Sequence, residues 1–344
     1  MRYGIMHARE GNVKKRITMK EIARLANVSQ ATVSRVINGN PDVNEELAAR
    51  VWKVIEEVGY VPNQTAQTLK RNQSKLIGVS VSEMYNPYFV ELVDHLEDKA
   101  RKLGYNIILH NAKHNPILEW ENIQNFLTRQ IDGCIIVPAG RHNLERIGKL
   151  PVPVVSITQT VDALDSVAID HFKAGKLAAH SFIRSGHTSF AYIGKADDEK
   201  YLGFASGLYE HQLPVSAVRV LELEQTSNDH FLVRQGIEKH FREFDAFPFT
   251  CVFTENDIIA LECIRLVEER GLKVPEDISV IGFDDTLLSK IMGISSIHQP
   301  IEEMVTTTLE LLINRIEGKL SPDIVSIQLE PTLITRRSSN HRRI

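Results

Sequence analysis

The stretch of this 344-residue chain that decides its N-terminal fold is residues 18–59, TMKEIARLANVSQATVSRVINGNPDVNEELAARVWKVIEEVG. Thr18 and Glu21 have the spacing of a capping box, which predicts a helix of about two turns. Ser29 is a second capping residue and predicts a short helix over Gln30–Asn38. The Asn-Gly-Asn-Pro run that begins at Asn38 is a strong signal for the end of that helix.

A third helix is predicted to follow directly. Asn44 has the character of an N-cap, the apolar residues of Glu45–Val58 recur on one helical face, and Gly59 stands where a helix commonly ends. Two short helices joined by a tight turn and braced by a third form a helix-turn-helix, the plan of many DNA-binding domains.

The second of these helices has two chemically different faces. Val33, Val36 and Ile37 fall together and should pack on the first helix. The opposite face carries polar or small residues that suit DNA: Gln30, Ala31, Thr32, Ser34, Arg35 and Asn38. Glutamine can pair with adenine, arginine with guanine and an alanine methyl with thymine, while hydroxyl groups can hold phosphates. The same pattern also fits the solvated face of a small helical domain.

From Leu76 the pattern changes to apolar strands that alternate with amphipathic helices. We expect strands at 76–81, 106–109, 134–137, 154–157, 190–193, 218–223, 251–253, 278–281, 294–297 and 324–329, and helices at 88–103, 118–127, 172–185, 258–270 and 301–316. This alternation predicts βαβ units in parallel sheets, and the two successive series predict two α/β lobes.

Charge is divided unequally along the chain, although the net charge is only −4. Up to Lys75 there are 13 Lys and Arg against 7 Asp and Glu, a balance of +6, and the remainder carries −10. A basic segment on an acidic body favours contact with a polyanion at one end, although it also fits a solvated tail. There is no apolar run of about 18 residues and no secretion signal, so we expect a cytoplasmic protein without membrane contact.

Several segments together resemble one protein family. Ile17–Ala23, Val28–Gly39 and Gly59–Asn63 look like the DNA-binding head of the lactose-repressor/galactose-repressor (LacI/GalR) family of bacterial transcription regulators, and the similarity extends from Ile17 to about Ser338. The resemblance implies an α/β fold in which a helix-turn-helix head and a hinge helix precede a two-lobed parallel α/β domain like that of periplasmic binding proteins. Three crossings of the chain would join the lobes.

The resemblance also implies a division into domains. We expect an N-terminal extension at residues 1–16, which is a basic arm or an over-long start, and a helix-turn-helix domain at 17–62. A hinge at 63–74 and an effector-binding and dimerisation domain at 75–344 follow.

The DNA-binding mode implied by the family is a homodimer on a pseudo-palindromic operator in double-stranded DNA. Two recognition helices would enter the major groove, and two Leu69 side chains would wedge into the minor groove between them. Together with the recognition-helix residues, the implied contacts include Thr18, Asn63, Ala66 and Leu69. From its residues alone, 63–70 is better interpreted as a flexible linker, because it carries little apolar surface. The resemblance to the family favours the hinge helix instead.

The effector site is expected after the strands, where parallel sheets bind ligands. Asp284 and Asn256 each follow a strand, and Tyr88 and Phe89 follow the first strand and its loop; all four match family positions that contact the effector. Two further positions depart from the family: Thr158 replaces an acidic residue, and Lys200 stands where an arginine is usual. We therefore expect a sugar or a sugar phosphate. We expect Asp257 to cap the helix that follows Asn256. For Asp284 the alternative to effector contact is likewise a helix cap, and for Tyr88 and Phe89 it is a place in the core.

Other classes of function fit the sequence less well. The chain has no GxSxG, HExxH, Walker A or strand-linked GxGxxG motif, so we expect no enzyme, and no histidine pair has a spacing that suits a metal. No cofactor is expected. A solute-binding protein would need a signal peptide and no DNA-binding head. An activator, or a regulator of the same fold that ignores small molecules, remains an alternative to a repressor.

Overall fold

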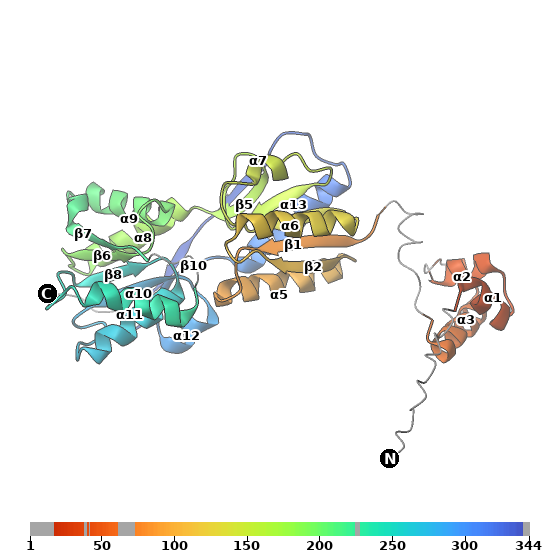
Figure 1. The fold of residues 1–344 in the computed structure, drawn as a ribbon, viewed down its shortest axis with the longest axis horizontal. Coiled ribbons are helices and arrows are strands. Elements are labelled where there is room, and N and C mark those ends of the chain that lie inside the picture. The colour runs from red at the N-terminus through yellow and green to blue at the C-terminus, as the bar shows by residue number, and fades with distance from the viewer. Residues whose placement is uncertain (1–16, 38–39, 41, 61–72, 224–227, 340–344) are drawn as a thin grey trace, which may run out of the picture. The chain divides into compact units, whose positions relative to one another are not determined.

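The structure, a computed structural model, describes residues 17–37, 40, 42–60, 73–223 and 228–339. The chain divides into two compact units at the boundary between Ser74 and Lys75. The first unit is helical and the second is a two-lobed α/β body, as the ribbon shows (Figure 1).

The first unit contains three helices, α1 (Met19–Leu25), α2 (Gln30–Ile37) and α3 (Glu45–Val58). Thr18 and Glu21 form the predicted capping box, and Asn44 accepts the backbone N–H groups of Glu46 and Leu47 at the start of α3. Gly59 ends α3 with a φ of 61°, a conformation that glycine adopts without strain. Local capping chemistry therefore sets where these helices begin and end.

The three helices share one small apolar core. Its buried residues are Ile22, Ala23, Ala26, Val33, Val36, Val51 and Ile55. As predicted, Val33 and Val36 face this core. Leu25, which has the helical spacing of a core residue, instead lies 49% exposed. The core therefore fixes which face of α2 is turned away from the protein.

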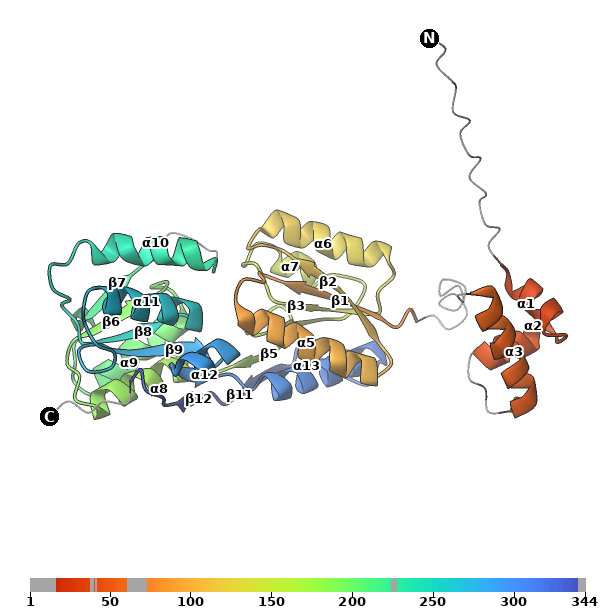
Figure 2. The ribbon, with the colours of Figure 1, turned by 90° about the horizontal axis from the view of Figure 1, so that it is seen from below.

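The first lobe of the second unit is built on a sheet in the order β11-β5-β4-β3-β1-β2, and all of its neighbouring strands are parallel. The strands are β1 (Leu76–Val81), β2 (Asn106–Asn111), β3 (Gly133–Ile136), β4 (Val154–Ile157), β5 (Asp165–Ile169) and β11 (Ser326–Leu329). Its helices are α5 (Pro87–Lys102), α6 (Pro116–Thr128), α7 (Leu144–Ile147) and α13 (Ile301–Ile316). Figure 2 shows α5 and α13 on one face of the sheet and α6 and α7 on the other.

The second lobe repeats this plan with a sheet in the order β12-β10-β9-β8-β6-β7. Its strands are β6 (Phe190–Ile193), β7 (Val218–Leu221), β8 (Cys251–Thr254), β9 (Ser279–Asp284), β10 (Ser295–His298) and β12 (Thr332–Ile334). All neighbours are parallel except β10 and β12, which are antiparallel. The helices are α8 (His171–Arg184), α9 (Glu199–Glu210), α10 (His230–Phe241), α11 (Asp257–Glu269) and α12 (Leu287–Met292), with a 3-10 turn, η1, at Val215–Ala217. Figure 2 shows α8 and α9 on one face and α10 and α11 on the other.

The chain passes between the lobes three times. It crosses from β5 to α8, returns from β10 to α13, and crosses again from β11 to β12. The predicted fold class, a helix-turn-helix head followed by a two-lobed parallel α/β domain, is confirmed, with β12 as an antiparallel exception at one sheet edge.

Several elements were not predicted. The strand β5 and the helices α7, α9, α10 and α12 lie in stretches to which we assigned no element, as does β12. Helix α9 escapes prediction because it contains Gly203 and Gly207. A Cβ on Gly203 would stand 1.9 Å from the carbonyl oxygen of Phe172, so these glycines allow close packing of α9 on α8. The packing of α9 on α8 therefore explains why glycines, which usually interrupt helices, occur within α9.

The helices of the described ranges do not include a candidate for a membrane span. Each of them is too short or too polar to cross a bilayer.

Candidate nucleic-acid and ligand-binding sites

The exposed face of α2 is the first candidate site. Gln30, Ala31 and Arg35 are exposed, and Thr32 and Ser34 are half-buried, while Val33 and Val36 are held in the core. The hydroxyl of Ser29 caps the helix by accepting the backbone N–H of Thr32 at 3.0 Å. The helix is thus fixed on one side and presents amide, methyl, hydroxyl and guanidinium groups on the other, which are the groups that read base edges and phosphates.

Other predicted DNA contacts stand differently. Thr18 is exposed, but its hydroxyl already donates to the Glu21 carboxylate at 3.0 Å and accepts the Glu21 N–H at 3.3 Å. Asn38, Asn63, Ala66 and Leu69 lie outside the residues that the structure describes. A role in DNA contact stays a prediction for all five.

Asp284 is the centre of the second candidate site. It ends β9, is 5% exposed and has a φ of 103°, a backbone conformation that is strained for a residue with a side chain. Its carboxylate accepts a hydrogen bond from the Asn86 amide at 2.8 Å and one from the Gln299 amide at 2.7 Å. Burial raises the pKa of Asp284 to about 7, with the charge of Lys200 opposing and that of Asp257 adding to the shift. The group is therefore held ready to change its charge near neutral pH.

Lys200 lies close enough to Asp284 for their charges to interact. Its ammonium donates to the backbone carbonyl of Glu255 at 3.1 Å, lies 3.7 Å from Asp198 and stands 4.2 Å from the centroid of the Phe283 ring. Burial lowers the pKa of Lys200, but the charges of Asp198, Glu255 and Asp284 outweigh it and raise the pKa overall. Lys200 is thus a half-buried cation whose charge is balanced by carboxylates of the protein itself.

His171 completes this group, which sequence reasoning missed. Its ring stacks on Phe283 with centroids 5.7 Å apart. Burial, reinforced by the charge of Lys200, lowers the pKa of His171 to about 4, so the imidazole is neutral at physiological pH. The position of His171 at the start of the α8 helix gives no local signal of this contact.

Asn256 has the capping role that we expected of Asp257, and contact of Asn256 with the effector stays a prediction. Asn256, not Asp257, caps α11, because its side-chain oxygen accepts the N–H groups of Ile258 and Ile259. The expected cap role of Asp257 is therefore wrong. The Asp257 carboxylate instead accepts the N–H and hydroxyl of Thr286, each at 2.9 Å, and the hydroxyl of Ser296 at 2.6 Å. Its role is to join α11 to the loop after β9.

The three other predicted effector contacts are buried or half-buried. Tyr88 is 2% exposed, packs in the core and donates its hydroxyl to the Gln299 side-chain oxygen at 3.2 Å. Phe89 is half-buried and meets the Tyr88 ring edge-on. Thr158 follows β4 with a φ of 75°, an outlier for a β-branched residue. The alternative of a core role for Tyr88 is compatible with this packing, and effector contact stays a prediction.

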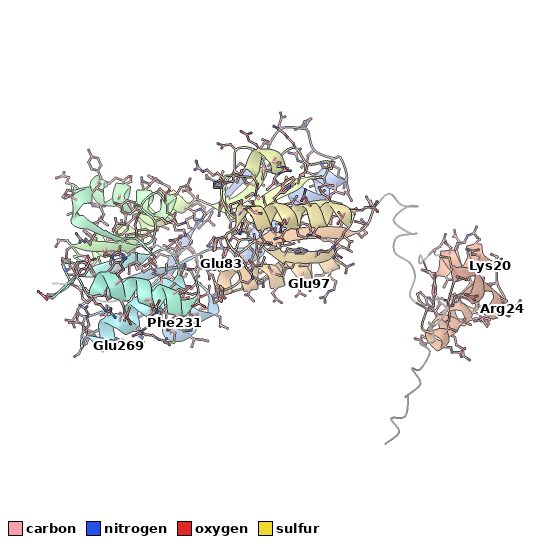
Figure 3. The ribbon with its side chains drawn as sticks, viewed as in Figure 1. Lys20, Arg24, Glu83, Glu97, Phe231 and Glu269 are labelled. Carbon is pink, nitrogen blue, oxygen red and sulfur yellow. The ribbon has the colours of Figure 1, made fainter. Side chains whose placement is uncertain are left out.

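A second contact between the lobes also involves residues that sequence reasoning did not single out. Glu83, from the loop after β1, is 3% exposed and accepts hydrogen bonds from the side-chain amide and the backbone N–H of Asn228. Figure 3 shows Glu83 where the first lobe meets the second. Glu83 and Asn228 are 145 residues apart in the sequence, so no local sequence pattern could predict that they form a pair.

A pocket of about 590 Å³ lies where α5, α12, the end of β9 and the start of α13 meet. Asp284 and Gln299 line it together with carboxylates, two histidines and a lysine: Glu91, His95, Asp285, Lys290, His298, Glu302 and Glu303. Asp284 is the one predicted effector residue in this lining. The other five, Tyr88, Phe89, Thr158, Lys200 and Asn256, are not part of it. Within the described ranges, no group of His, Cys, Asp and Glu side chains has an arrangement that could hold a metal.

Comparison with known proteins now gives the family. Residues 18–63 match the family described as bacterial regulatory proteins, lacI family, and residues 179–339 match a periplasmic binding protein-like domain. The chain is 33% identical over 335 residues to catabolite control protein A of Priestia megaterium, covering 94% of this chain and 99% of that protein. The chain belongs to the LacI family.

Two more similarities bear on what members of this family do. The chain is 31% identical over 340 residues to the HTH-type transcriptional repressor PurR of Aliivibrio fischeri (strain ATCC 700601 / ES114), covering 94% and 99% of the two chains. Among solved structures, the transcriptional regulator CelR in complex with cellobiose has a TM-score of 0.65 and 26% identity, covering 94% of this chain and 100% of that one. This LacI-family chain is therefore related over its full described fold to transcription regulators.

Proposed function

We propose that this chain is a sequence-specific DNA-binding transcription regulator, a repressor whose operator affinity is controlled by a small-molecule effector. The observation that carries the proposal is the exposed polar face of α2, fixed by its own cap and by the core beneath it. The full-length relationship to a repressor supports the sign of regulation. An activator, or a regulator that ignores small molecules, is the alternative within the same family.

The proposed DNA-binding mode is a homodimer on a pseudo-palindrome in double-stranded DNA. Each chain offers one recognition helix, and a two-fold operator needs two. Gln30, Ala31 and Arg35 would face base edges, and Thr32 and Ser34 would hold phosphates. At the centre, Leu69 of each chain would enter the minor groove, with Asn63 and Ala66 beside it.

Arg35 gives the sharpest test of this mode. After operator selection from a randomised DNA pool, Arg35→Ala should cost about 1–3 kcal/mol of binding and relax the preference at one base pair. Arg50→Ala is the matched control, since it removes the same charge from an exposed position on α3. If Arg35→Ala weakens every sequence equally, as a lost phosphate contact would, the base-reading role of Arg35 is wrong.

The proposed effector is a carbohydrate that binds between the lobes beside Asp284 and Lys200. A carboxylate such as Asp284 accepts hydrogen bonds from sugar hydroxyls, and a regulator of related sequence is known in complex with cellobiose. The Lys200 ammonium lacks the planar fork of the arginine usual in the family. Because Asp198 and the Glu255 carbonyl already surround it, an uncharged sugar fits this site better than a sugar phosphate.

A further inference from the structure

A closed circuit of hydrogen bonds joins four buried residues around Asp284. The Asn86 amide donates to Asp284 Oδ2 at 2.8 Å, and the Gln299 amide donates to Asp284 Oδ1 at 2.7 Å. The Tyr88 hydroxyl donates to Gln299 Oε1 at 3.2 Å, and the Tyr88 backbone N–H donates to Asn86 Oδ1 at 3.0 Å. Each residue is thus bonded to the next, and the last to the first.

The four residues come from both lobes and from the chain between them. Asn86 and Tyr88 stand at the start of α5 in the first lobe, and Asp284 ends β9 in the second. Gln299 lies between β10 of the second lobe and α13 of the first. The bond between Asn86 and Asp284 is therefore a direct side-chain link between the lobes, and Gln299 bonds Asp284 on one side and Tyr88 on the other.

All the polar groups of the circuit are withdrawn from water. The four residues are between 2% and 5% exposed, and both oxygens of Asp284 already accept an amide proton. Buried hydrogen bonds to a charged group are stronger than ordinary ones, and a buried acceptor left without a donor is costly. A group that reaches Asp284 Oδ2 must accordingly be a hydrogen-bond donor, and in this buried space it competes with Asn86 for the oxygen.

We propose that Asn86 is an intramolecular stand-in for the effector: it latches the two lobes through Asp284 in the ligand-free protein, and a donor group of the ligand displaces it. The ligand part of this inference rests on the proposed function, whereas the latch does not. The displaced group is an amide donor, so the ligand must offer a hydroxyl or an amine at this point, and a phosphate oxygen cannot replace it. Ligand entry and release of the cross-lobe bond are then one event.

The circuit is tested by comparing two serine substitutions at matched positions. Asn86→Ser keeps an oxygen that can cap α5, but its shorter side chain does not reach Asp284. Asn115→Ser is the control, because Asn115 caps α6 in the same way and, like Asn86, precedes a proline. Its side-chain oxygen accepts the N–H groups of Ile117 and Leu118, which belong to the same lobe. Both variants keep a helix cap, and only the first removes the latch.

The distance between the lobes is the readout. Spin labels are attached to Glu97→Cys in α5 and Glu269→Cys in α11, which Figure 3 places on different lobes. The three native cysteines are buried and should not compete for the label. Labelled full-length chain is diluted into unlabelled chain so that each distance comes from a single molecule, and it is measured without ligand by pulsed electron spin resonance.

We expect a longer and broader distance distribution for Asn86→Ser and an unchanged distribution for Asn115→Ser. Equal distributions for Asn86→Ser and the wild type, or the same change in both variants, overturn the latch. Cellobiose and ribose then serve as probes. If Asn86 stands in for the ligand, a sugar that stabilises the wild type should bind more tightly to Asn86→Ser than to the wild type. Weaker or equal binding to Asn86→Ser refutes the stand-in role. If neither sugar stabilises the wild type, these two effectors are excluded, and the distances still decide the latch.

Discussion

At the scale of single residues, Asp284 shows that burial sets the pKa of a carboxyl group, which the residue type alone does not determine. Its position after a strand was predicted, and aspartates in such positions commonly cap helices or bind ligands. The structure instead places it on two amides, beside Lys200, with a pKa raised by burial to about 7. The neighbours that set this pKa come from sequence positions up to 198 residues away, so no local pattern could have predicted them.

This raised pKa has a consequence for stability against pH. A carboxyl whose pKa is higher in the folded than in the unfolded protein stabilises the fold fully below about pH 4 and loses that contribution as pH rises to about 7. Asp284→Asn removes the titration, at most about 4 kcal/mol at about 1.4 kcal/mol for each pKa unit. We expect the difference in unfolding free energy between wild type and variant to change between pH 4 and pH 8, measured by urea denaturation. Parallel pH curves for the two proteins would show that Asp284 does not titrate in this range.

At the scale of elements, the segments that were missed share a physical cause. The strand β5 begins with Asp165, a residue that strands disfavour, and its carboxylate forms a bidentate pair with Arg315, 150 residues away. Helix α9 contains two glycines whose value lies in its contact with α8. The caps at Thr18, Asn44 and Gly59 were predicted because capping is local. For β5 and α9, contacts with distant parts of the chain therefore outweigh the local sequence pattern.

The contact between α8 and α9 gives a prediction at this scale. Gly203→Ala places a methyl group 1.9 Å from the Phe172 carbonyl and must push the helices apart, at a cost of about 1–3 kcal/mol. Since Lys200 lies one turn earlier in α9, sugar binding should weaken as well. Leu202→Ala, at a 48% exposed position of the same helix, is the control and should change thermal stability little. A Gly203→Ala variant as stable as Leu202→Ala would mean that the helices do not approach this closely.

At the scale of the whole molecule, the two parts of the chain differ in net charge. The positive balance of +6 belongs to the segment up to Lys75, and the −10 belongs to the remainder. A positively charged segment attracts polyanionic DNA and a negatively charged one repels it, so this distribution favours DNA contact on the N-terminal side of Lys75. The change in charge along the chain coincides with the boundary between the two compact units, which lies between Ser74 and Lys75.

Two compact units predict two responses to ligand. An uncharged sugar at 100 times its dissociation constant should stabilise the α/β unit that begins at Lys75 by about 2.7 kcal/mol. It should leave the unfolding of the N-terminal helical unit unchanged. The corresponding sugar phosphate should stabilise the α/β unit less, because carboxylates surround Lys200. Differential scanning calorimetry of the full chain with each sugar and its phosphate checks both points. Stronger stabilisation by the phosphate would contradict the assignment of an uncharged effector.

The three passages of the chain between the lobes limit how this protein can be cut or recombined. A fragment that ends after α13 lacks β11 and β12, and so loses an edge strand from each sheet at once. Neither lobe is a continuous piece of sequence, so no single uninterrupted fragment contains one complete lobe, and one crossover cannot exchange a lobe with that of a homologue. During synthesis, the sheet of the first lobe is complete only after β11 has been made, and that of the second only after β12. Damage near the C-terminus is therefore felt in both halves of the body.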